Sequence, residues 1–118
     1  MQTRVPMNWT FFLERIMLVG KTQPLEMAQR VLQASTLQLI AKSPYTIYGW
    51  KIVDRWAVND PQKLSALEAQ GEILLLSRLL EQQTTEMDVL TTQAALERLA
   101  AGETEFEILA SAQVQTEL

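Results

Sequence analysis

Residues 60–102 read DPQKLSALEAQGEILLLSRLLEQQTTEMDVLTTQAALERLAAG and carry the strongest helical signal in the chain. Asp60 is suited to an N-cap, and Pro61 to the first helical position, where a missing N–H costs nothing. Gly102 stands where a left-handed C-cap is expected. A mainly apolar row between these ends alternates steps of three and four residues, which is the spacing of coiled-coil core positions. Its members are Ile73, Leu76, Leu80, Gln83, Met87, Leu90 and Ala94.

The length of this stretch limits the shapes that it can take. As one unbroken helix it would extend for about 60 Å, whereas a compact domain of this size has a radius of gyration of about 13 Å. We therefore expect either a helical hairpin or a long C-terminal helix whose apolar row meets a partner chain. Typical helix lengths favour the hairpin, and its bend is predicted within residues 83–88, where Thr85 is suited to cap a second helix.

The composition is that of an ordinary folded protein, and it narrows the possible chemistry. The 118 residues are 47% hydrophobic and 20% charged; with the helical signals, this predicts one all-α domain over residues 1–118, a small bundle of about four to six helices. Cysteine and histidine are absent, which excludes thiol nucleophiles, Ser-His-Asp triads and zinc or haem sites with Cys or His ligands. Glu68 and Glu72 lie one turn apart, but a carboxylate metal pair in a bundle usually has Glu-x-x-His partners. We expect no enzyme activity, no metal and no cofactor.

The charge is divided unevenly between the two halves of the chain. Residues 1–63 contain eight Lys or Arg against four Asp or Glu, and residues 64–118 contain two against ten, so the halves carry +4 and −8. The acidic second half leaves the first half as the only plausible surface for phosphate groups. The stronger expectation is that the two halves attract each other, within one fold or between copies.

The first third of the chain is expected to form two helices. The first runs over residues 8–20 and buries an apolar stripe, and the second runs over residues 23–42, where Ser43-Pro44 stops it. The first apolar run is too short to span a bilayer, Glu14 and Arg15 interrupt it, and no small-residue cleavage site follows. We therefore expect a cytoplasmic protein with no membrane partner.

Residues 45–58 read YTIYGWKIVDRWAV and hold four of the eight aromatic residues of the chain. Their β-branched and aromatic residues favour a strand, but Ser43-Pro44 resembles another helix start and no other strand is evident, so a helix is predicted. At 100° per residue, one face of this helix is the predicted core face. It carries Tyr45, Ile52, Val53 and Trp56. The opposite face carries Tyr48, Lys51 and Arg55.

A short final helix is predicted after Gly102. Thr104 and Glu107 have the spacing of a capping box, in which each side chain bonds the backbone N–H of the other residue. Four residues of this region are expected to dock onto the bundle, and residues 115–118 are expected to fray. The docking residues are Phe106, Leu109, Ala110 and Val114.

The leading hypothesis is a non-enzymatic protein-interaction or assembly module. We expect a small acidic helical adaptor, subunit or inhibitor that uses an apolar helix face to bind another protein chain or itself, as a homo-oligomer. This hypothesis depends on the Leu-rich helix and on the lack of a catalytic set. The expected interface residues are Ile73, Leu76, Leu80, Met87 and Leu90.

The alternative is a nucleic-acid-binding regulator that reads its target with residues 46–56. The string TIYGWK at residues 46–51 resembles the recognition helices of helix-turn-helix repressors, in which Thr and Tyr contact the backbone and Lys or Arg reaches phosphates or guanine. A turn of only Ser43-Pro44 departs from the usual three or four residues. A competing interpretation has the two cations paired with the acidic second half of the chain. The resemblance implies nucleic-acid contacts from Thr46, Tyr48, Lys51 and Arg55.

Overall fold

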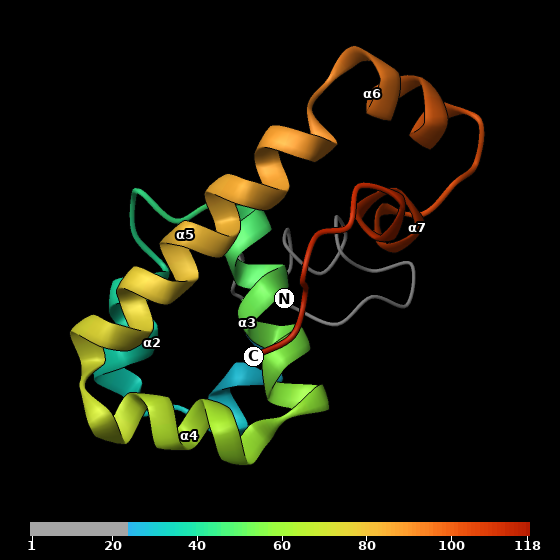
Figure 1. The fold of residues 1–118 in the computed structure, drawn as a ribbon. Coiled ribbons are helices and arrows are strands. Elements are labelled where there is room, and N and C mark those ends of the chain that lie inside the picture. The colour runs from blue at the N-terminus through green and yellow to red at the C-terminus, as the bar shows by residue number, and fades with distance from the viewer. Residues whose placement is uncertain (1–23) are drawn as a thin grey trace, which may run out of the picture.

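The computed structural model describes residues 24–118, and every regular element in this part of the chain is helical (Figure 1). The elements are the 3-10 helix η2 (Ala28–Arg30) and the α-helices α2 (Ala34–Ile40), α3 (Ile47–Asn59), α4 (Pro61–Gln70), α5 (Glu72–Leu90), α6 (Gln93–Ala100) and α7 (Glu105–Ser111). The predicted all-α bundle is confirmed. No helix among these residues is long and apolar enough to cross a membrane. The helix predicted over residues 8–20 lies outside the described residues.

Helix α3 packs against α5, α4 and η2 and so joins the elements around the first part of the core (Figure 1). It buries Ile52, Val53 and Trp56, each no more than 1% exposed, as the predicted core face requires. Burial of such a side chain contributes about 1.5–3 kcal/mol, so this group is a major source of stability. These three side chains belong to a larger apolar core, which we call the first cluster. Its buried members are Leu25, Ala28, Leu32, Ile40, Ile52, Val53, Trp56, Ala57, Leu64, Leu75 and Leu79.

Helix α3 confirms the helix predicted over residues 45–58, but it begins at a different cap. The side chain of Thr46 accepts the N–H of Tyr48 at 3.2 Å and forms the N-cap, so Ser43-Pro44 does not open this helix. A threonine at this position satisfies one of the free N–H groups of the first turn. Tyr45 therefore precedes the helix and is half-buried, and its hydroxyl donates to the carbonyl of Leu76 at 2.8 Å.

The first break in residues 60–102 lies at Gly71, so the bend predicted within residues 83–88 is wrong. Gly71 has an extended backbone, with φ 161° and ψ 128°, and separates α4 from α5. Thr85 lies inside α5, where its hydroxyl donates to the carbonyl of Glu81 at 3.0 Å. The hydroxyl of Thr85 is thus satisfied without a break in the helix. A break at Gly71 is favoured instead, because glycine has the lowest helix propensity of any residue except proline.

The second break is set by Thr92, whose hydroxyl accepts the N–H of Ala95 at 3.1 Å and caps α6. Helix α6 then ends at the glycine that the sequence predicts. Gly102 has φ 104°, and the N–H of the following Glu103 donates to the carbonyl of Arg98 at 3.0 Å. This is a Schellman motif, in which a left-handed residue lets the next N–H reach back into the last turn. The predicted left-handed C-cap is confirmed.

The second predicted helix is replaced by η2 and α2. Leu25 has φ 65°, which a continuous right-handed helix cannot contain. The carboxylate of Asp54 in α3 accepts the N–H groups of Leu25 and Ala28, both at 2.9 Å, and holds this part of the chain against α3. Helix α2 starts after Gln33, whose N–H donates to Glu68 in α4 at 2.9 Å. Bonds from distant residues thus divide a segment whose local sequence favours one helix.

The final helix, α7, confirms the predicted capping box of Thr104 and Glu107. Leu109 is buried against α5 and α6, where a second cluster forms at the far end of α5 (Figure 1). Phe106 and Ala110 were expected to dock with it, but both are exposed, Phe106 to 63%. The buried members of the second cluster are Leu90, Ala95, Ile108 and Leu109.

Candidate functional site

Helix α3 comes close to α5 where Gly49 meets the side-chain amide of Gln83. Gln83 is 4% exposed, and its two amide atoms bond the chain just before α3. Oε1 accepts the N–H of Thr46 at 2.9 Å, and Nε2 donates to the carbonyl of Pro44 at 3.1 Å. A buried glutamine of α5 therefore positions the start of α3.

A buried polar network joins the same two helices further along. Arg55 of α3 forms an ion pair with Glu86 of α5, with 2.6 Å between Nη2 and Oε2, and the Glu86 side chain is only 4% exposed. Gln82 donates to Glu86 at 2.7 Å and accepts from Arg78 at 2.7 Å. The Arg78 guanidinium lies over the Trp56 ring, 5.1 Å from its centroid. Because Glu86 is desolvated, removal of its cation would leave a buried charge unpaired.

Residues 114–118, here called the C segment, lie across this network, so the prediction that residues 115–118 fray is wrong. The carbonyl of Thr116 accepts Nε and Nη2 of Arg55 at 3.1 and 2.8 Å, and the indole N–H of Trp56 at 2.9 Å. The preceding carbonyl, of Gln115, accepts the Gln82 amide at 2.7 Å. Thr116 is only 9% exposed. Side-chain donors from both helices thus bind two consecutive backbone carbonyls.

Side chains at each end of the C segment add further contacts. Val114 packs against the second cluster, and Leu118 packs against the first. The carboxylate of Glu117 accepts the Asn59 amide at 3.1 Å and lies 3.7 Å from Nε of Arg55. The segment is therefore held by an apolar contact at each end, with backbone and charged contacts between them.

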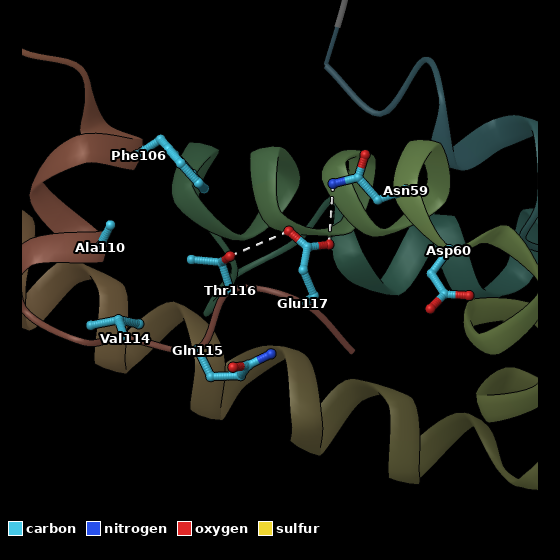
Figure 2. Close-up of a pocket in the computed structure, with 8 residues that line it drawn as sticks. All are labelled: Asn59, Asp60, Phe106, Ala110, Val114, Gln115, Thr116 and Glu117. Atoms are coloured by element: carbon cyan, nitrogen blue, oxygen red, sulfur yellow. Dashed lines mark hydrogen bonds between the residues drawn. The ribbon is translucent and has the colours of Figure 1, made fainter.

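A pocket of about 610 Å³ opens beside the C segment, between the end of α3 and α7 (Figure 2). Phe106, Ala110 and Val114 lie at one end of it, and Asn59 and Asp60 lie at the other. The remaining lining residues are Gln115, Thr116 and Glu117. The C segment therefore forms one wall of the pocket, whose two ends differ in polarity.

The four residues predicted to contact nucleic acid in the alternative hypothesis all make contacts within the protein. Thr46 is the N-cap of α3, and Tyr48 is half-buried against the second cluster. Lys51 lies 2.9 Å from Glu105 of α7, and its Nζ is 5.7 Å from the centroid of the Tyr48 ring. Arg55 belongs to the polar network. The structure brings Tyr48 and Lys51 together, but acidic groups of the second half of the chain pair with both cations.

The predicted interface row on α5 runs from solvent into the core. Ile73 is 76% exposed, Leu76 packs on the first cluster, and Leu80 and Met87 are half-buried. Leu90, the last member, is buried in the second cluster. The neighbouring Leu74 is 52% exposed and was not predicted. We call the partly or largely exposed part of the row the α5 apolar row. It consists of Ile73, Leu76, Leu80 and Met87.

The buried face of α5 lies beside this row. Its members are Leu75, Leu79, Gln82, Gln83, Glu86 and Leu90. Residues 73–76 are all apolar, so the pattern fits more than one helical register at its start. Further along, the buried positions are taken by polar side chains, which apolar periodicity does not detect. The polar residues Gln82, Gln83 and Glu86 follow Leu75 and Leu79 at helical spacing, and this pattern could have indicated a buried polar network.

The carboxylates that the sequence offered as a metal pair have structural partners instead. Glu68 accepts the N–H of Gln33, and Glu72 accepts the hydroxyl of Thr36 at 3.2 Å. Within residues 24–118, no group of three or more acidic side chains is placed to hold a metal ion. Asp54 was not singled out from the sequence. Burial raises its pKa above the ordinary value, although the backbone N–H groups that it accepts act in the opposite direction.

Comparison with known proteins found no matching family model, no matching curated protein and no matching solved structure. The geometry of the described residues is therefore the basis for a functional proposal.

Proposed function

We propose that this chain is a non-enzymatic protein-interaction and assembly module, which binds through the α5 apolar row and the adjoining Leu74. The observation that carries the proposal is the exposure of two adjacent large apolar side chains, Ile73 at 76% and Leu74 at 52%, on the first turn of α5. Adjacent apolar residues that are continuous with a core mark an interaction surface more often than single exposed residues do. The next member of the row, Leu76, already packs on the first cluster, so a partner would extend the existing core.

A second copy of the chain is the partner that this row fits best. Its members recur at steps of three, four and seven residues along one helix, which is the spacing of helices that pack side by side. An isologous dimer pairs one surface with itself, and a single self-complementary row satisfies that condition without another surface. We therefore propose a homodimer, in which α5 of one protomer packs against α5 of its partner.

The contacts of the cations favour this proposal over nucleic-acid binding. Arg55 would have to leave Glu86, whose side chain is 4% exposed, before it reached a phosphate. Lys51 would have to leave Glu105. Phosphate binding draws its affinity from cations that are free to replace counterions, and here both cations already have acidic partners.

Static light scattering of the purified protein over a range of concentrations tests the proposal. We expect a dimer, and we expect Ile73→Glu with Leu74→Glu to give a folded monomer, because both side chains are exposed in the protomer. Val58→Glu is the matched control, since Val58 is an apolar residue of α3 with 56% exposure and lies outside the row. A wild-type monomer at all concentrations, or a double variant with the wild-type mass, would contradict dimerisation through this row.

A further inference from the structure

We infer that the groove between α3 and α5 is a peptide-binding site, and that the C segment is the ligand it holds within the chain. An extended peptide of the same chemistry, supplied by a partner protein, can take its place. The groove is separate from the α5 apolar row, so this inference does not depend on the proposed dimer.

The helix side of the groove requires an occupant. Trp56 is fully buried and Gln82 is 4% exposed, yet the indole N–H of the first and the amide of the second both point at the C segment. Arg55 adds two further N–H groups to the carbonyl of Thr116. Without a peptide, the buried indole N–H of Trp56 would lose its acceptor, and Arg55 and Gln82 would keep only Glu86 as an acceptor, which is unfavourable.

These donors recognise the backbone of the occupant more than its side chains. Their acceptors are the carbonyls of Gln115 and Thr116, and any extended peptide presents such carbonyls. Recognition of extended peptides commonly divides in this way, with affinity from main-chain bonds and selectivity from side-chain positions. The groove is therefore suited to peptides other than its own C segment.

The C segment is less deeply buried than Trp56 and Gln82, which bind its carbonyls. Only Thr116 is buried, whereas Val114, Glu117 and Leu118 are half-buried and Gln115 is exposed. The segment leaves α7 through Gln113, whose φ is 62°. Residues other than glycine rarely adopt this backbone conformation. A weakly buried segment that follows a strained residue is suited to exchange with a competing peptide.

The side chains of the C segment define the partner sequence. Val114 and Leu118 place apolar side chains on the second and first clusters, and Glu117 lies between Asn59 and Arg55. The occupant is therefore a peptide with an apolar residue, any residue, a small polar residue, an acidic residue and an apolar residue, in that order. Its acidic fourth position selects it by charge complementarity with Arg55.

A fluorescently labelled, end-capped peptide of residues 112–118 tests this inference by fluorescence anisotropy. The receptor is the full chain with Val114→Asp and Leu118→Asp, which loosens the C segment without altering the groove. We expect this variant to bind the peptide at least about tenfold more tightly than the wild type does, because the wild-type groove is occupied. A peptide with Glu117→Lys should bind at least about tenfold more weakly, as expected when a charged contact is replaced by repulsion.

A second measurement covers the case in which the loosened variant does not fold. The indole N–H resonance of Trp56 in the wild-type protein should shift on addition of excess peptide and should not shift with the Glu117→Lys peptide. No binding to the folded variant, or equal binding of the two peptides, would overturn the inference. Both chains can also carry Ile73→Glu and Leu74→Glu, so that the α5 apolar row does not pair them. Dimers of the loosened variant with a chain that keeps its own C segment, formed in this background without peptide uptake, would also overturn the inference, and would assign the groove to the C segment of a second copy.

Discussion

Gly49 of α3 faces the side chain of Gln83 in α5 so closely that a Cβ atom at position 49 would overlap Oε1 of the glutamine. Gln83 has little freedom to move, because it is buried and its amide is bonded to Thr46 and Pro44. The missing side chain at position 49 therefore lets the two helices, which are also the helices that bind the C segment, approach each other.

Gly49→Ala should lower the free energy of unfolding by about 1–2 kcal/mol, measured by urea denaturation. Displacing the bonded amide of Gln83 costs about 1–3 kcal/mol, which exceeds the roughly 0.5–1 kcal/mol that alanine gains over glycine inside a helix. The sign should reverse in a Gln83→Ala background, where the overlap is gone and only the helix propensity remains. In Gly71→Ala, the control, the new Cβ makes only ordinary contacts with Leu74, the nearest at 3.6 Å. A stabilising Gly49→Ala in the wild-type background would contradict this interpretation.

Glu86→Gln should be among the most destabilising polar substitutions in the described chain. It keeps the shape of the side chain but leaves Arg55 without its buried counter-charge, which we expect to cost about 2–4 kcal/mol, below the upper range for buried pairs because the Arg55 side chain is 23% exposed. Glu105→Gln removes the exposed partner of Lys51 and is the matched control, with an expected cost below about 1 kcal/mol. Thermal denaturation distinguishes them, and equal losses for the two variants would argue against a buried network.

Asp54 should give the stability of the protein a specific pH dependence. Burial raises its pKa in the folded state, so the folded protein binds the proton more tightly than the unfolded chain does. The contribution of Asp54 to the free energy of unfolding is therefore fully present below the pKa of the unfolded state, and it falls as pH rises through the folded-state pKa.

Urea denaturation of the wild type and Asp54→Asn between about pH 3 and pH 6 isolates this contribution, because the other carboxylates titrate in both proteins. We expect the stability of the wild type relative to the variant to fall as pH rises across that range. A difference that rises with pH would show that the N–H bonds from Leu25 and Ala28 dominate over burial.

Gln113→Gly should stabilise the protein by about 1 kcal/mol, because Gln113 occupies the left-handed position of a Schellman motif at the end of α7. Its φ is 62°, and the N–H of Val114 donates to the carbonyl of Leu109 at 3.0 Å, as the motif requires. Gly102→Gln tests the same position at the end of α6 in the opposite direction. No atom lies within 4 Å of a Cβ built on Gly102, so its cost of about 1 kcal/mol should come from the backbone alone. Differential scanning calorimetry should show opposite shifts in Tm, and shifts of the same sign would contradict the assignment.

The elements that the sequence predicts well are those fixed by neighbouring residues. The capping box of Thr104 and Glu107, the C-cap at Gly102 and the buried face of α3 depend on spacings of a few residues. The all-α fold class was also predicted correctly from such patterns, because helix caps and helical periodicity are short-range signals.

The errors occur where distant residues fix the backbone. Asp54 holds Leu25, which is 29 residues away in sequence, and no local pattern in the second predicted helix indicates this bond. The C segment is bound through the carbonyl of Thr116, and a carbonyl carries no information about the side chains that will bind it. The charge division did predict that cations of the first half would meet acids of the second, as Arg55 and Glu86 do.

The most direct test of the proposed function uses the absence of cysteine from the chain. Ser77→Cys introduces a single thiol at an exposed position of α5 beside the row, and this thiol can carry a spin label. If α5 packs against α5 in a symmetric dimer, pulsed electron paramagnetic resonance should detect dipolar coupling between the two labels. The coupling should grow with protein concentration and disappear when Ile73→Glu is added. A labelled protein without coupling at any concentration would contradict assembly through the α5 apolar row.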